Sequence, residues 1–378
     1  MTNQATPARV EWVDIAKGLC IILVVMLHST SGVEVALGQE SWMGEIVAFA
    51  QPFRIPAFFF VAGLFLASRI DRDWRAYADA KVMHFVYFYV LWVTIQFAFK
   101  APGFIAENGV LSVMQLYLMS FVQPFGTLWF IYLLPVFFVF TKFVRSAAPS
   151  IVIAFGVALE LLPVHTGSII IDEFCSRFIY FYCGYMFAKY AFRIAEEAVR
   201  RPEIAGAGLL LWAGATFFLV QANAAGWPIV SLILGAAGTA ALVSISALLS
   251  KTVVGNVLTY VGSRSLVVYL AFFLPMAVTR IALIKLGIVP DVGLVAAIVL
   301  IAAVTGPLIL DYLIQRVGFG HFLFVRPGWA RLPKGIAPKP PQRPLKSRRD
   351  QGEDVAVAML ASRGPKKPGE GRRIIPAE

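Results

Sequence analysis

The chain has 378 residues, of which 59% are hydrophobic and only 15% are charged. Soluble domains usually carry about 25% charged residues, because their surface must face water. The composition therefore excludes an ordinary soluble protein and indicates that lipid covers much of the surface. The net charge of +11 is distributed unevenly along the chain.

Most of the positive charge lies in the C-terminal segment 326–378. This segment has 13 Lys and Arg against 5 Asp and Glu, a net charge of +8, together with nine prolines. It has few large apolar side chains and cannot bury a core, so we predict a disordered, basic cytoplasmic tail. Beside a membrane, such a tail is expected to contact anionic lipid headgroups. No nucleic-acid-binding module accompanies the charge, which argues against a nucleic-acid partner.

The cysteine pattern indicates neither disulfides nor a metal site. The chain has three cysteines, Cys20, Cys175 and Cys183, and all lie in or next to apolar segments. The count is odd, and no Cys/His spacing resembles that of a zinc site. We therefore expect no metal cofactor.

Apolar segments recur along the chain at lengths that suit membrane spans. A helix needs about 20 apolar residues to cross the hydrocarbon layer. The candidates are 14–33, 46–67, 83–99, 128–144, 150–163, 174–191, 204–222, 228–249, 265–284 and 292–314. The fifth is short, so the count is nine or ten. The sequence predicts an all-α, polytopic transmembrane helical bundle of about ten spans over residues 14–315, preceded by a cytoplasmic N-terminal segment, 1–13.

The orientation follows from the positions of the basic residues. Even-numbered connections between the spans hold twelve Lys and Arg, whereas odd-numbered connections hold mainly Asp and Glu. Connections rich in Lys and Arg tend to stay in the cytoplasm. This alternation predicts that both termini are cytoplasmic, in what we expect to be a bacterial inner membrane. The connection after the second span holds four of these basic residues, Arg69, Arg72, Arg75 and Lys81.

The first span carries three ionisable residues, Asp14, Lys17 and His28. Charged groups inside a span are costly and are candidates for function. Lys17 and His28 are eleven residues apart, which places them on the same side of a helix and about 16.5 Å apart along its axis. Asp14 lies three residues before Lys17 and can pair with it. The alternative is structural: a boundary ion pair at Asp14 and Lys17, and a histidine that meets lipid headgroups.

The second span contains Arg54, which two prolines, Pro52 and Pro56, flank. Arg54 is expected near the outer surface, about level with His28. A cation there could hold an anionic acceptor, or stabilise the oxyanion that develops during acyl transfer. The alternative is an arginine whose charge reaches the membrane surface.

Taken in order, these motifs resemble the acyltransferase-3 family of integral membrane acyltransferases. The resemblance covers roughly residues 9–315 and is closest to a poorly characterised bacterial inner-membrane branch. The matching pieces are Asp14, Lys17-Gly18, the ten residues from Lys17 to His28, the Phe-rich stretch Pro56 to Gly63, the basic group after span two, Leu128 to Ile131, Arg177 to Gly184, and Tyr260 to Leu270.

The resemblance implies transfer of an acyl group, usually acetyl from acetyl-CoA, to a hydroxyl of a cell-envelope or secreted glycan or glycolipid. It makes His28 the catalytic histidine and Lys17 its partner basic residue, with Asp14 beside it. The basic group Arg69, Arg72, Arg75 and Lys81 would then bind the phosphates of the acyl-CoA donor. The residues fit this chemistry independently, because a neutral imidazole can take the proton of an attacking hydroxyl.

The chain departs from the family pattern at three places. Ala62 stands where many members have Ser, Phe272 stands where they have a late histidine, and Lys81 and His84 replace the usual arginines before span three. These changes leave Lys17 and His28 intact, but they affect the expected donor site. His84 is a candidate for supporting that site.

Two other functions compete with the acyltransferase. A transporter or exporter would suit a bundle with buried charges, although no strong internal repeat is visible. A non-catalytic membrane partner of glycan assembly would depend on the tail and not on Lys17 or His28.

Overall fold

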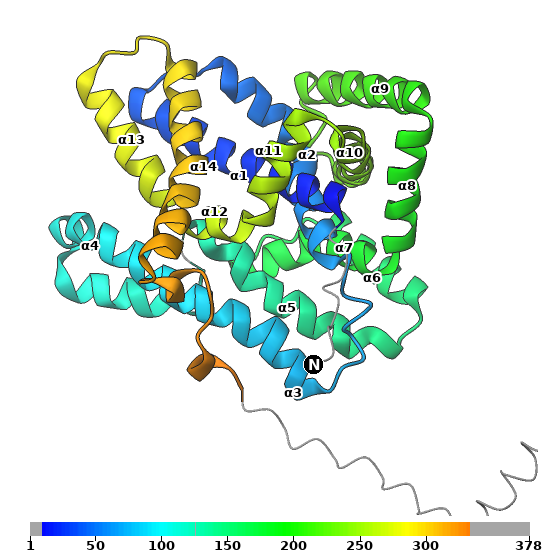
Figure 1. The fold of residues 1–378 in the computed structure, drawn as a ribbon, viewed down its shortest axis with the longest axis horizontal. Coiled ribbons are helices and arrows are strands. Elements are labelled where there is room, and N and C mark those ends of the chain that lie inside the picture. Colours follow the sequence, from blue (N-terminus) through cyan, green and yellow to red (C-terminus); the bar gives the residue numbers. More distant parts are fainter. Residues whose placement is uncertain (1–9, 125, 333–378) are drawn as a thin grey trace, which may run out of the picture. The chain divides into compact units, whose positions relative to one another are not determined.

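The computed structural model describes residues 10–124 and 126–332, which form helices and no strand (Figure 1). The α-helices are α1 (Glu11–Leu37), α2 (Trp42–Gly63), α3 (Trp74–Ala78), α4 (His84–Met119), α5 (Trp129–Phe143), α6 (Pro149–Leu161), α7 (Ile169–Met186), α8 (Ala188–Arg200), α9 (Pro202–Gln221), α10 (Pro228–Leu249), α11 (Val253–Ser263), α12 (Ser265–Ala271), α13 (Phe273–Leu286) and α14 (Val292–Val317). A π-helical turn, η1 (Asp79–Met83), joins α3 to α4, and short 3-10 turns are η2 (Gly126–Leu128), η3 (Val144–Ser146), η4 (His321–Leu323) and η5 (Gly328–Ala330).

Each of the ten expected spans is helical, but fewer helices are long and apolar enough to cross a membrane. Within the described residues seven helices meet that requirement, or eight if α11 and α12, which are bent by 62° at Arg264, form one span. Three expected spans account for the difference. The expected span 150–163 is the short α6. The expected span 174–191 corresponds mainly to α7, which carries the charged residues Asp172, Glu173 and Arg177. The expected span 265–284 divides into α12 and α13.

Helix α1 lies at the centre of the bundle. It packs most extensively against α11, α14, α2 and α10, and Figure 1 shows it surrounded by these helices. Its side chains Ile15, Cys20, Ile21 and Val25 are completely buried. The position follows from the sequence, because a span that is apolar on most of its sides can be enclosed by other helices rather than by lipid.

Glycines let two pairs of helices approach backbone to backbone. In α1 and α11, a Cβ on Gly18 would clash with the carbonyl oxygen of Leu258, and a Cβ on Gly262 would clash with that of Asp14. In α2 and α7, a Cβ on Gly63 would meet the carbonyl oxygen of Phe181 in the same way. Small residues at such crossings are a common device in membrane bundles. They fix the positions of α1 and α2, the two helices that carry His28 and Arg54.

The first residues of the predicted tail are ordered. Arg326 is buried, and its Nη2 lies 2.7 Å from a carboxylate oxygen of Asp79. The Leu332 amide donates a hydrogen bond to the same carboxylate. The disordered segment was therefore predicted to begin too early, because a cation that looks solvated in the sequence has a buried partner 247 residues away. The remainder of the predicted tail, and most of the N-terminal segment 1–13, lie outside the described residues.

Candidate active site

Helix α1 places Lys17 and His28 in two different cavities. The first, which we name the Lys17 pocket, has a volume of about 240 Å³. The second, the His28 pocket, has a volume of about 200 Å³. Eleven residues of α-helix separate the two side chains by about 16.5 Å along the axis. The sequence prediction that both lie on one side of a helix is consistent with this arrangement, but the two residues do not act on the same atoms.

The Lys17 pocket is mainly apolar, with Lys17, His84 and Ser265 among its polar residues. The Lys17 ammonium lies 3.2 Å from a carboxylate oxygen of Asp14, as the sequence spacing predicted. Asp14 is almost completely buried, whereas the Lys17 side chain keeps 33% of its surface exposed. Asp14 is therefore fixed in the protein interior, whereas the Lys17 ammonium remains accessible to a ligand.

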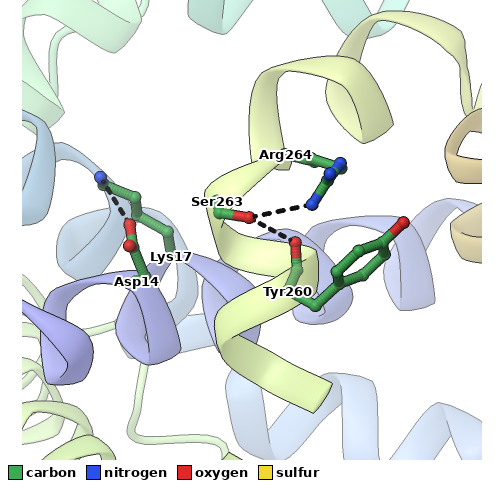
Figure 2. Close-up of polar contacts among 5 residues, drawn as sticks. All are labelled: Asp14, Lys17, Tyr260, Ser263 and Arg264. Atoms are coloured by element: carbon green, nitrogen blue, oxygen red, sulfur yellow. Dashed lines mark hydrogen bonds and ion pairs between the residues drawn. The ribbon is translucent and has the colours of Figure 1, made fainter. Parts of the chain in front are cut away.

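A second cation, Arg264, follows the neighbouring helix α11. Figure 2 shows Asp14 and Lys17 bonded to each other on α1, with Tyr260 and Ser263 on the neighbouring α11 and Arg264 at the junction between α11 and α12. The Arg264 guanidinium lies 4.1 Å from the centre of the Tyr260 ring and 3.5 Å from a carboxylate oxygen of Asp311. Arg264 is thus held by its own partners and immediately precedes Ser265 of the pocket wall.

The His28 pocket contains the polar residues His28, Arg54, Thr127, Glu173 and Arg177. Arg177 donates to Glu173 over 3.1 Å, so these two residues form an ion pair and also line the pocket. Arg54 is 7% exposed, and its Nε and Nη1 have no hydrogen-bond partner among the described residues. The pocket therefore brings together an imidazole and two guanidiniums, one of which is already paired.

The half-buried imidazole of His28 stacks on Phe272, with the ring centres 5.7 Å apart and an angle of 27° between the planes. Phe272 occupies the position at which the acyltransferase-3 pattern has a late histidine. Within the described residues no protein group donates to or accepts from the His28 ring. Stacking, rather than an orienting carboxylate, therefore sets the ring plane, and the ring nitrogens remain available to a substrate.

Three aromatic residues separate the two pockets, because Phe58, Phe130 and Tyr269 line both of them. The Phe58 and Phe130 rings stack with their centres 4.4 Å apart. The Tyr269 hydroxyl donates to the Thr127 carbonyl over 2.6 Å and accepts from the Ile131 amide over 3.3 Å. We call these three residues the aromatic partition. The sequence motifs contained all three, but only the packing of α2, α5 and α12 reveals that they meet.

The predicted phosphate-binding group lies apart from the walls of both pockets. Arg69, Arg72 and Arg75 occupy the turns between α2 and α3 and the start of α3. The buried Lys142 shapes this connection by donating to the carbonyls of Ile70 and Arg72, over 2.6 Å and 2.7 Å. Lys81 lies 4.2 Å from the centre of the Phe138 ring. The role of these four basic residues in binding a donor remains a prediction, while His84, one turn beyond Lys81, does line the Lys17 pocket.

One polar pocket residue, Thr127 of the His28 pocket, lies outside the sequence motifs. Its only sequence signal is that it precedes the motif Leu128 to Ile131. Trp129 and Ser265 belong to motifs, but nothing in the sequence placed Trp129 in the His28 pocket or Ser265 in the Lys17 pocket. All three lie at helix starts whose direction depends on tertiary packing.

The long apolar helices define a polytopic membrane protein. Its ionisable side chains line two cavities that share a wall, which defines an internal site. The family model described as an acyltransferase domain, acyltransferase-3, matches residues 10–312. The chain therefore belongs to the acyltransferase-3 family and is an integral membrane acyltransferase. A search of curated proteins and a search of solved structures gave no match.

Proposed function

We propose that this acyltransferase moves an acyl group, most simply acetyl, from acyl-CoA to a hydroxyl of a cell-envelope or secreted glycan or glycolipid. The single observation that carries the proposal is the placement of Lys17 and His28 by one helix in two pockets separated only by the aromatic partition. The donor would enter from the Lys17 side, and the acceptor hydroxyl would reach His28 from the other side.

The proposed sidedness combines the charge pattern of the connections with this geometry. The Lys- and Arg-rich connections favour a cytoplasmic location for both termini, in a bacterial inner membrane. Lys17 lies near the start of α1, and His28 lies three turns later. Cytoplasmic acyl-CoA would therefore meet Lys17, His84 and the basic connection first, where cations attract its phosphates. The thioester end of its extended arm would pass the aromatic partition to reach His28.

In the proposed mechanism, a ring nitrogen of neutral His28 accepts the proton of the acceptor hydroxyl as its oxygen attacks the thioester carbonyl. A carbon–oxygen bond forms, and the carbonyl oxygen becomes an oxyanion. The carbon–sulfur bond then breaks, the ester remains on the acceptor, and the proton on His28 passes to the leaving CoA thiolate. Every atom and electron pair is accounted for without a metal or a redox cofactor.

Asp14 would act through Lys17 in this scheme. Its buried carboxylate holds the ammonium at the edge of the Lys17 pocket, where the ammonium can contact a donor phosphate or carbonyl. Membership of an acyltransferase family favours this scheme over the transporter that the sequence left open.

The test compares ester-linked acyl groups on envelope glycans from cells lacking the protein and from cells restored with the native chain or with His28→Ala. Mass spectrometry before and after mild base treatment gives the mass of the ester. We expect an ester that is lost without the protein and restored only by the native chain. Restoration by a stably inserted His28→Ala variant would refute the catalytic role of His28.

A further inference from the structure

The Arg54 side chain is a buried cation for which the described protein supplies no counter-ion. It is 7% exposed, lies in α2 between Pro52 and Pro56, and lines the His28 pocket. Its Nε and Nη1 are buried and lack hydrogen-bond partners within the described part of the chain. Leaving N–H groups of a buried cation unpaired is costly, so such an arrangement is typical of a site that a ligand completes.

The carboxylate that lines the His28 pocket is committed to another partner. Glu173 accepts from Arg177 over 3.1 Å. Across residues 10–124 and 126–332, no carboxylate oxygen lies within 4.0 Å of the Arg54 guanidinium. The pocket therefore holds two guanidiniums and one carboxylate, which leaves a local excess of one positive charge.

We propose that Arg54 binds an anionic group of the acceptor, so that the acceptors of this enzyme are acidic: sugar acids or phosphorylated sugars, free or on a lipid. The planar fork of a guanidinium matches the oxygens of a carboxylate or a phosphate and fixes their direction as well as their charge. Because Arg54 and His28 line one cavity of about 200 Å³, an acid held at Arg54 places a hydroxyl of the same or the adjoining sugar at the imidazole. Only the identification of the bound molecule as the acceptor rests on the proposed function.

A neighbouring cavity is suited to the rest of a glycan. It has a volume of about 430 Å³, shares Arg177 with the His28 pocket, and is lined by the polar side chains of Gln51, Gln221, Asn223 and Ser231. Amides and hydroxyls both donate and accept hydrogen bonds, as sugar hydroxyls do. The acidic sugar at Arg54 would therefore be one end of a longer polar acceptor that continues past Arg177.

The competing role for Arg54 is stabilisation of the oxyanion in acyl transfer. That role would be needed in every turnover, whatever the charge of the acceptor, and it would not require the free protein to prefer an anion. Selectivity between a charged acceptor and its neutral counterpart therefore separates the two roles, and a binding measurement without any acyl donor separates them most cleanly.

The experiment uses the full chain in lipid nanodiscs and measures equilibrium binding of methyl glucuronoside, its neutral counterpart methyl glucoside, and glucose 6-phosphate. Trp129 lines the pocket, so its fluorescence is a natural readout. We expect the native chain to bind at least one of the two anionic probes more tightly than the glucoside. Which of them binds distinguishes a carboxylate from a phosphate acceptor. We expect Arg54→Gln to weaken the binding of that probe by about ten- to a hundredfold, the range for hydrogen bonds to charged groups.

Three further variants make the result specific. Arg54→Lys keeps the charge but loses the fork and should recover part of the affinity. Arg280→Gln removes a cation that does not line the pocket and should bind as the native chain does. His28→Ala should lose acyl transfer but keep the preference for the anion, so a failure of the proposed function and a failure of this inference give different results.

Equal binding of the acidic and neutral probes, or an Arg54→Gln variant that binds like the native chain, would overturn the proposal. So would the absence of binding of both acidic probes at about 10 mM, a concentration that reveals even weak sites. If Arg54→Gln instead lowers acyl transfer to neutral and acidic acceptors equally, Arg54 serves the oxyanion.

Discussion

At the scale of single residues, the His28 pocket combines a base held by stacking with a buried cation without a counter-ion. The His28 ring lies against Phe272, and the Arg54 guanidinium lies in the same pocket. A neutral imidazole is a suitable general base near pH 7. In the proposed function, the pocket would supply a base for the acceptor hydroxyl and an attractive charge for the rest of the acceptor.

Phe272 gives the first prediction at this scale. Phe272→Leu removes the ring against which His28 stacks but keeps an apolar side chain at this buried position. An aromatic pair contributes about 0.5–1.5 kcal/mol, so acyl transfer should fall by roughly two- to tenfold through a lower kcat. The KM for acyl-CoA should hardly change, because Phe272 does not line the Lys17 pocket. A raised KM with an unchanged kcat would show that the ring serves the donor instead.

The sequence predicted some of these residues and not others, for physical reasons. The helical period related Lys17 to His28 and Asp14 to Lys17, because both relations lie within one helix. The aromatic partition and the contact between His28 and Phe272 join residues 72 to 244 positions apart in the chain, and no local rule relates them. Arg54 was a candidate from its charge alone, but the absence of a partner could only be found in three dimensions.

At the scale of helices, the crossings of α1 with α11 and of α2 with α7 position the site. Gly18 and Gly262 bring α1 and α11 together at the turn that carries Lys17 and Asp14. The helices themselves were predictable from their apolar lengths. The reduced number of complete spans was not, because the bend of 62° between α11 and α12 and the division of the expected span 265–284 into α12 and α13 have no clear signal in the apolar pattern.

Gly262→Ala tests the crossing of α1 and α11. The added methyl group would clash with the backbone at Asp14, and backbone cannot move aside as a side chain can. Overpacking of this kind costs about 1–3 kcal/mol, so we expect a lower thermal midpoint and a higher KM for acyl-CoA. The matched control is Gly206→Ala in α9, where a Cβ meets nothing within 4 Å. It should be neutral or stabilising by up to about 1 kcal/mol, because Ala favours helix. Equal effects of the two substitutions would contradict the proposed crossing.

At the scale of the whole molecule, α1 connects two chemical environments. One end lies beside a cation–carboxylate pair and a mainly apolar pocket, and the other lies in a pocket with two guanidiniums. In the proposed function, the arm of the thioester would pass this shared aromatic wall while water is excluded, which would protect the thioester from hydrolysis.

Arg326 links the end of the described chain to the beginning of the long segment Trp74–Ala106. Arg326→Ala would leave the Asp79 carboxylate without its closest cation. Since Asp79 keeps 25% of its side chain exposed, we expect a loss of about 1–3 kcal/mol in unfolding free energy, below the full cost for a completely buried pair.

Truncation after Leu332 keeps the pair of Arg326 and Asp79 and should leave thermal stability and acyl transfer unchanged. A loss of activity in the truncated chain would assign a function to the predicted tail.

The most direct test of transfer across the partition uses sealed membrane vesicles of both orientations, containing the natural acceptors, with labelled acetyl-CoA added outside. We predict base-labile labelling of glycan or glycolipid only in inside-out vesicles, in which the proposed cytoplasmic side faces the donor. His28→Ala should reduce this labelling by about 100- to 10,000-fold, the range for loss of a general base. Equal labelling in both orientations, or undiminished labelling with His28→Ala, would contradict a donor that enters at Lys17 and an acceptor that reacts at His28.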